Sequence, residues 1–87
     1  MKLLLCLVCQ DIIRLQREIR QCKCGLVEGH YLADGINAEY SGDNAIPIGF
    51  ANISFVKAIN SQPENGPGRE FTAFVIPKHC CSMKKKG

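Results

Sequence analysis

The sequence predicts a small α+β protein with a single domain. Short apolar segments separated by turn residues predict a small antiparallel sheet, and one amphipathic segment near 53–61 predicts a short helix. Four of the six cysteines fall in two close pairs before residue 25. A chain of 87 residues with 46% hydrophobic residues and no Trp can build only one thin core, so a bound metal would offset part of that weakness.

The N-terminal segments lead from one cysteine pair to the other. Residues 3–8 are continuously apolar and predict a buried strand. Residues 10–21 fit two structures. Ile12, Leu15 and Ile19 have the spacing of a helical face, whereas apolar and polar residues also alternate as in a strand. We favour an irregular hairpin over a short helix, because the chain must return to the first cysteine pair.

The middle of the chain predicts strands joined by tight turns. Residues 28–40 predict two strands around the Asp-Gly pair at 34–35, a sequence typical of a type I′ turn. A second turn is expected at 41–44. Residues 45–50 predict a short strand, which Pro47 should place at a sheet edge or strand end.

The last third predicts the helix and one more strand. Asn52 is expected to cap the helix near 53–61, and residues 63–69 have the composition of a flexible loop. Alternating residues 71–76 predict a strand that Pro77 ends.

Charge and the two ends of the chain predict the domain limits. The net charge is +3, much of it from the lysines at 84–86, so we expect a zinc-stabilised domain over 1–79 and a basic, disordered tail over 80–87. Residues 1–9 imitate a signal peptide, but the apolar run is short and lacks a cleavage site. It is also shorter than the roughly 20 residues of a membrane span. We therefore expect a cytoplasmic protein without a membrane partner.

The two cysteine pairs predict a zinc site. Cys6 and Cys9 are spaced by two residues, Cys22 and Cys24 by one, and Gly25 follows with the backbone freedom that a metal-binding turn needs. Four thiolates can surround Zn²⁺ tetrahedrally at about 2.3 Å and leave no position for water or substrate, so the ion would be structural.

Disulfides and free thiols are the alternatives. Disulfides in small secreted domains usually close long loops, whereas here four cysteines crowd the first quarter and Cys80 and Cys81 are neighbours. Two features depart from the usual zinc pattern: Gln10 stands where such a turn often has Gly, and the second pair is tighter than CxxC. A second site at His79, Cys80 and Cys81 lacks an obvious fourth ligand, and an exposed, oxidisable terminus is its alternative.

Five segments of the chain carry a resemblance to other proteins. They are the CxxC…CxCG start, Asn-Ala-Glu-Tyr-Ser-Gly-Asp at 37–43, Pro-Ile-Gly-Phe-Ala-Asn at 47–52, Ser-Phe-Val-Lys-Ala at 54–58 and Phe-Val-Ile-Pro-Lys at 74–78. In these segments the chain resembles a group of small uncharacterised bacterial and phage-type proteins. The resemblance covers most of the chain and implies the same four ligands, but no activity. The N-terminal third is also similar to zinc ribbons, which bind nucleic acid or protein.

Two other sets of residues are candidates for binding. A ligand or partner surface is expected from polar groups among apolar neighbours: Asn37, Glu39, Tyr40, Ser41, Asp43 and Asn52. Ordinary turn and cap chemistry is the alternative reading. Nucleic-acid contacts would come from the basic residues between and within the cysteine pairs, Arg14, Arg17, Arg20 and Lys23, for which a solvated surface is the alternative.

No catalytic residues are predicted, because no nucleophile–base set, phosphate loop or dinucleotide fingerprint is present. The sequence therefore favours a non-enzymatic zinc-binding protein that interacts with another macromolecule, and we expect that partner to be a protein. A nucleic-acid-binding zinc ribbon and a small-ligand binder or enzyme built on residues 37–52 remain the alternatives.

Overall fold

The structure, a computed structural model, describes residues 1–86 and contains two four-stranded sheets. The first sheet has the order β2-β1-β6-β7 and is antiparallel throughout. Its strands are β1 (Lys2–Cys6), β2 (Ile12–Arg14), β6 (Ala45–Phe50) and β7 (Ala73–Val75). The second has the order β3-β4-β5-β8. Its strands are β3 (Arg20–Gln21), β4 (Glu28–Tyr31), β5 (Ala38–Ser41) and β8 (Met83–Lys85).

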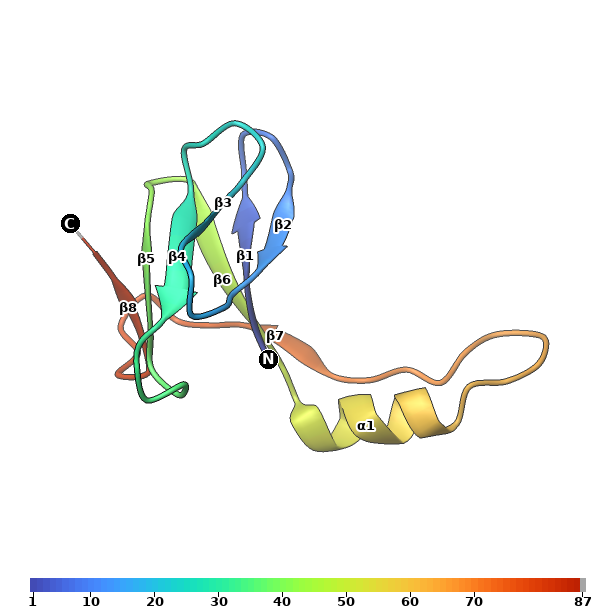
Figure 1. Cartoon of the computed structure of the whole chain (residues 1–87). Coiled ribbons are helices and arrows are strands. Elements are labelled where there is room, and N and C mark those ends of the chain that lie inside the picture. The colour runs from blue at the N-terminus through green and yellow to red at the C-terminus, as the bar shows by residue number, and fades with distance from the viewer. Residues whose placement is uncertain (87) are drawn as a thin grey trace.

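The core lies between the two sheets, and both sheets contribute to it (Figure 1). Leu4, Cys6, Val27 and Met83 are its largest fully buried side chains. The other buried hydrophobic residues are Ile13, Leu15, Cys22, Ala38, Tyr40, Ala45 and Ile76. Alternating burial along β5 and β6 shows that each strand turns one face inward, as the period of two predicts.

The helix α1 (Asn52–Asn60) extends away from the sheets together with the loop that follows it (Figure 1). The predicted α+β class and the short helix are therefore confirmed. Asn52 is not the helix cap, however. Ala51 occupies the cap position without a side-chain hydrogen bond, and the Asn52 Oδ1 atom accepts a hydrogen bond from the Met1 amino group at 3.1 Å. In the described residues 1–86, no helix has the length and apolarity needed to cross a bilayer.

The segment 10–21 is extended, but it is not a hairpin. β2 pairs with β1 in the first sheet, whereas β3 pairs with β4 in the second. The segment therefore crosses between the sheets and does not fold back on itself. Pairing with other parts of the chain overrides the helical spacing of its apolar residues.

The strands β4 and β5 form the predicted hairpin, with a turn different from the expected one. Gly35 has a φ of +69°, but Asp34 does not share the positive φ that a type I′ turn requires. Instead, the Asp34 Oδ1 atom accepts hydrogen bonds from the backbone N–H groups of Ile36 and Asn37, both at 2.9 Å. These bonds hold the pKa of Asp34 below its ordinary value.

β6 lies inside its sheet, so the prediction that Pro47 marks an edge or strand end is wrong. The Pro47 carbonyl accepts the Ile76 N–H at 2.9 Å, so the backbone polar groups of Pro47 face β7. The missing proline N–H is tolerated there because β7 ends at Val75.

The prediction of a disordered tail over 80–87 is wrong for its central part, and Gly87 lies outside the described residues. Met83–Lys85 forms β8, which pairs in parallel with β5. The Met83 side chain is fully buried, and burying a large apolar side chain stabilises a strand that carries lysines.

Candidate metal centre

The fold brings together the four cysteines predicted to bind metal. The Sγ atoms of Cys6, Cys9, Cys22 and Cys24 all lie within 4.8 Å of one another. The Cys22–Cys24 sulfur distance is 3.4 Å and the Cys6–Cys24 distance is 3.6 Å. A tetrahedron with metal–sulfur bonds of 2.3 Å has edges of about 3.8 Å. The arrangement therefore fits a single tetrahedral cation.

The same distances exclude disulfides among these four thiols in this structure. All six cysteines of the chain are free. A disulfide needs sulfur atoms about 2.05 Å apart, far closer than the pairs observed here.

Each cysteine pair lies on a tight backbone turn. The Gln10 N–H donates to the Cys6 carbonyl at 2.8 Å, and the Gly25 N–H donates to the Cys22 carbonyl at 3.0 Å. Gln10 has a φ of +60° and Gly25 a φ of +78°. In both turns the residue after the second cysteine has a positive φ and closes onto the carbonyl of the first cysteine, but the first turn is one residue longer and places a side chain in the left-handed region that favours glycine.

Hydrogen bonds tie the two turns to each other and to the residues that follow them. The Lys23 N–H donates to the Asp11 Oδ2 atom at 3.1 Å, so the second turn is tied to the residue after the first. The Cys22 N–H donates to the Val27 carbonyl at 3.0 Å. Cys6 and Cys22 belong to the buried core, while Cys24 is exposed. The centre therefore caps one end of the core and reaches the surface.

Three of the four thiols have a pKa that is shifted from the ordinary value of a cysteine. Burial opposes ionisation of Cys22, but the Val27 backbone N–H and the neighbouring thiols lower its pKa to about 6. The backbone N–H groups of Asp11 and Cys24 lower the pKa of Cys9. The Leu26 backbone N–H also favours the Cys24 thiolate, but burial and hydrogen bonds to the other three thiols raise the pKa of Cys24 to about 12.

These pKa shifts are linked, because the thiols hydrogen-bond to one another and titrate as one cluster. Backbone N–H groups favour the thiolates of Cys22 and Cys9, whereas Cys24 holds its proton because burial and hydrogen bonds to the other thiols favour the neutral form. A divalent cation would replace the protons that remain.

His79, Cys80 and Cys81 do not form a second centre of this kind. Over residues 1–86, the four-cysteine cluster is the one group of three or more ligating side chains close enough to share an ion. Cys80 is half-buried, and its hydrogen bonds with Ser82 lower the pKa of its thiol. Cys81 is exposed.

The residues of the predicted partner surface are divided among several environments. Tyr40 is buried in the core, whereas Glu39 is partly exposed and lies 3.9 Å from both His30 Nε2 and Lys86 Nζ. The Ser41 hydroxyl donates to a Glu28 carboxylate oxygen at 3.4 Å.

The remaining three residues of that set are also separated. Asn37 is bound to the Asp34 carboxylate within the β4–β5 turn. Asp43 is exposed and pairs with Lys85 at 3.3 Å. Asn52 lies at the start of α1 beside the N-terminus. The six residues therefore do not form one continuous surface.

The four predicted nucleic-acid contacts are all exposed. Within residues 1–86, none of Arg14, Arg17, Arg20 and Lys23 takes part in an ion pair. Arg14 lies on β2 and Arg20 on β3, so the basic residues extend along the segment that joins the two sheets.

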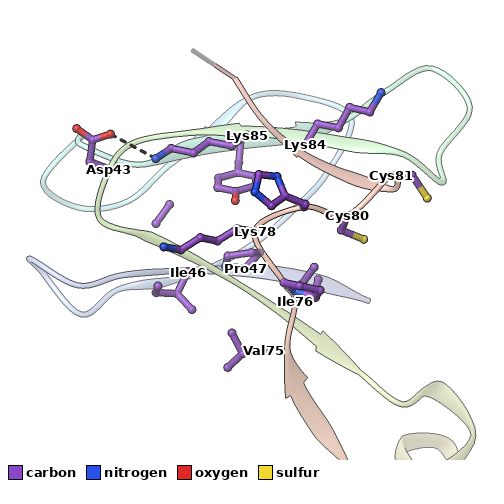
Figure 2. A pocket seen from close by; sticks show the side chains of 14 residues that line it. Asp43, Ile46, Pro47, Val75, Ile76, Lys78, Cys80, Cys81, Lys84 and Lys85 are labelled. Atoms are coloured by element: carbon purple, nitrogen blue, oxygen red, sulfur yellow. Dashed lines mark hydrogen bonds and ion pairs between the residues drawn. The ribbon is translucent and has the colours of Figure 1, made fainter.

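A cleft of about 1040 Å³ opens between β6, β7 and the C-terminal segment. Its walls include Ile46, Pro47, Val75 and Ile76, and lysines line its rim. Figure 2 shows Lys85 reaching towards Asp43, while Lys84 points away from that pair. Sequence reasoning missed this cleft, because it depends on the position of β8.

A second missed feature is an exposed apolar arm, which we define as residues 52–75. None of the residues of α1 is buried. The large exposed side chains of the arm, with their exposed fractions, are Ile53 (76%), Val56 (53%), Ile59 (55%), Phe71 (41%), Phe74 (50%) and Val75 (67%). The sequence shows that these side chains are apolar, but apolar side chains equally predict a buried face, so their exposure could not be predicted.

One aromatic cluster attaches the arm to the sheets. The rings of Phe50, Phe55 and Phe71 lie with centroids 4.9–5.1 Å apart. The Ser54 hydroxyl adds a bridge, because it donates to the Ala51 carbonyl and accepts the Thr72 N–H.

Comparisons of the chain with protein families, with curated proteins and with solved structures each find no match.

Proposed function

We propose that the four cysteines bind one structural zinc ion, and that the protein is a non-enzymatic module that binds another protein through the apolar arm. The observation that carries the first part is the set of four sulfur atoms within 4.8 Å. Thiolates are ligands that zinc prefers, and four of them close its coordination sphere. The ion would then stabilise the fold without taking part in a reaction.

The exposed side chains of the apolar arm support the second part. Monomeric soluble proteins rarely expose large contiguous apolar patches, and such patches usually mark interaction sites. The radius of gyration is 14.2 Å, whereas a compact chain of this length has about 12 Å. The helix and loop of the arm therefore project from the sheets, and β7 lies at a sheet edge, so a partner can reach all three.

Metal analysis and affinity capture test the two parts separately. We expect about one zinc per chain. We also expect the metal-bound protein to retain a partner from its native host. Ile53→Lys should abolish that capture, and Ile36→Lys, at a 69% exposed residue outside the arm, should not. Equal capture by both variants would contradict the assignment of the arm.

Nucleic-acid binding is a second candidate, favoured by the four exposed basic residues that lack ion pairs. Binding through phosphates would weaken steeply with salt. Removing Arg14 and Arg20 would flatten that dependence. A response to salt that is flat in the unmodified protein would exclude this candidate.

A small-ligand site is a third candidate, favoured by the cleft beside Asp43, Ile46 and Pro47. A ligand that binds the folded state raises the apparent melting temperature. A metabolite panel that leaves the melting temperature unchanged would count against it.

A further inference from the structure

The outer edge of β7 offers backbone groups for pairing. The Thr72 carbonyl accepts the Ala51 N–H at 2.8 Å, and the Ile76 N–H donates to the Pro47 carbonyl at 2.9 Å. Residues 72, 74 and 76 thus turn their backbone polar groups towards β6. Because these groups alternate along a strand, Ala73 and Val75 direct theirs to the open edge.

This edge is short and Pro77 lies just beyond it, but its side chains do not protect it from pairing. Residues 71–76 contain no charged side chain. Every residue of β7 is exposed, including Phe74 and Val75. Natural proteins usually place charges, proline or a covering element at such an edge. An uncharged, apolar edge is instead suited to accept another strand.

We propose that the apolar arm forms a homodimer in which β7 pairs antiparallel with β7 of a second copy. The register follows from the outward backbone groups: Ala73 of one chain faces Val75 of the other, and Phe74 lies on the two-fold axis. Each Ala73–Val75 pair exchanges N–H and C=O groups in both directions. The two Phe74 residues become directly opposite, non-hydrogen-bonded neighbours, while each ring stays over Gly49 of its own chain.

A second copy fits the arm in charge and in size. Residues 52–77 carry two positive and two negative side chains, which cancel, whereas the whole chain has a net charge of +3. Two arms can therefore meet without the repulsion expected elsewhere on the surface. At about 100 Å² for each large exposed side chain, the six supply at most on the order of 600 Å², which is the lower limit per partner for specific interfaces.

The helix α1 also favours a second copy of the chain as the partner. An isolated helix of nine residues is marginal in water, and α1 buries none of its residues within one chain. A two-fold contact centred on β7 would bring the two arms together and cover part of the helix surface. This inference rests on the proposed function, because it takes the arm as the contact surface. It adds that the partner is a second copy of the chain.

The test is analytical ultracentrifugation of the metal-bound full chain over a concentration series. We expect a monomer–dimer equilibrium that Val75→Lys weakens by about tenfold or more, because each dimer would then carry two lysines on its paired strands and charged side chains oppose pairing at a sheet edge. Val75 is 67% exposed, so this change leaves the fold of one chain intact. Ile36→Lys, at an equally exposed position in the β4–β5 turn, should leave the equilibrium unchanged.

Mixed samples of isotope-labelled and unlabelled chains test the register. We expect nuclear Overhauser contacts between the Phe74 Hα atoms of different chains, because directly opposite, non-hydrogen-bonded residues bring their Cα atoms to about 4.5 Å. A wild-type protein that is still monomeric at about 1 mM would overturn the inference. So would a dimer that Val75→Lys and Ile36→Lys weaken equally, or one without the Phe74 contact.

The outcomes for the dimer and for the proposed function remain distinguishable. A monomer that captures a different protein through the arm would overturn the dimer and leave the proposed function standing. A dimer that captures no other protein would support the dimer and count against the wider role.

Discussion

Replacing one exposed metal ligand is the most informative single perturbation. Cys24 is exposed, whereas Cys6 is fully buried in the core. Cys24→Ser therefore removes a sulfur ligand with little loss of core packing, which Cys6→Ser could not do. Its effect on stability reports on the metal.

The expected magnitude is large relative to the stability of so small a domain. Structural zinc contributes about 10–16 kcal/mol of apparent binding free energy in zinc-finger peptides. A domain of 87 residues is stable by about 4–13 kcal/mol. Loss of a quarter of the ligands removes a substantial part of that stability, so the melting temperature should fall by about 15–25 °C.

The assay combines thermal melting by circular dichroism with metal analysis of the same samples. Cys9→Ser should act in the same way as Cys24→Ser, because it removes another of the four ligands. Cys81→Ser is the matched control, since Cys81 is exposed and lies outside the cluster. We expect the control to keep its metal and to melt within about 4 °C of the unmodified protein. Equal effects of Cys24→Ser and Cys81→Ser would refute the assignment of ligands.

Three further predictions concern the backbone, pH and the C-terminal strand. Gln10→Gly should stabilise the protein by about 1 kcal/mol in chemical denaturation, since Gln10 has a φ of +60°; unchanged or lower stability would contradict this. The Asp34 carboxylate should titrate below its ordinary pKa, so its contribution to stability is present above that value and is lost as pH falls through the lowered pKa. Carbon chemical shifts measure that titration, and an ordinary pKa would show that the turn bonds do not form. Met83→Ala should cost about 2–5 kcal/mol, because the Met83 side chain is fully buried; a negligible change in chemical denaturation would mean that β8 does not form.

The sequence was most informative where a local pattern specifies the structure. The cysteine spacing predicted which thiols converge, because two short turns can each present two sulfurs to one point. The strand at Ala45–Phe50 was predicted with the same bounds as observed, since alternating burial suits its residues. Gly35 marked the β4–β5 turn for a similar reason, as it takes a positive φ.

Pairing between distant segments was the part that local patterns could not supply. β8 contains one apolar residue, Met83, among lysines, and its partner β5 lies 45 residues earlier. No periodicity in so short a segment reveals a parallel pairing. The prediction that Pro47 marks a sheet edge or strand end failed for a related reason. The missing N–H of Pro47 is tolerated only because β7 ends opposite it, which depends on residues far along the chain.

The exposed arm was missed because sequence alone cannot separate a buried apolar face from an exposed one. Ile53, Val56 and Ile59 have the spacing of a core-facing stripe, yet none of them is buried. Their exposure follows from the position of α1 beyond the sheets (Figure 1).

X-ray absorption at the zinc edge tests the metal centre most directly. We expect about one zinc per chain with four sulfur neighbours at about 2.3 Å and no oxygen or nitrogen in the first coordination sphere. A protein purified without zinc, or a zinc ion bound by fewer than four sulfurs, would contradict a closed centre formed by Cys6, Cys9, Cys22 and Cys24.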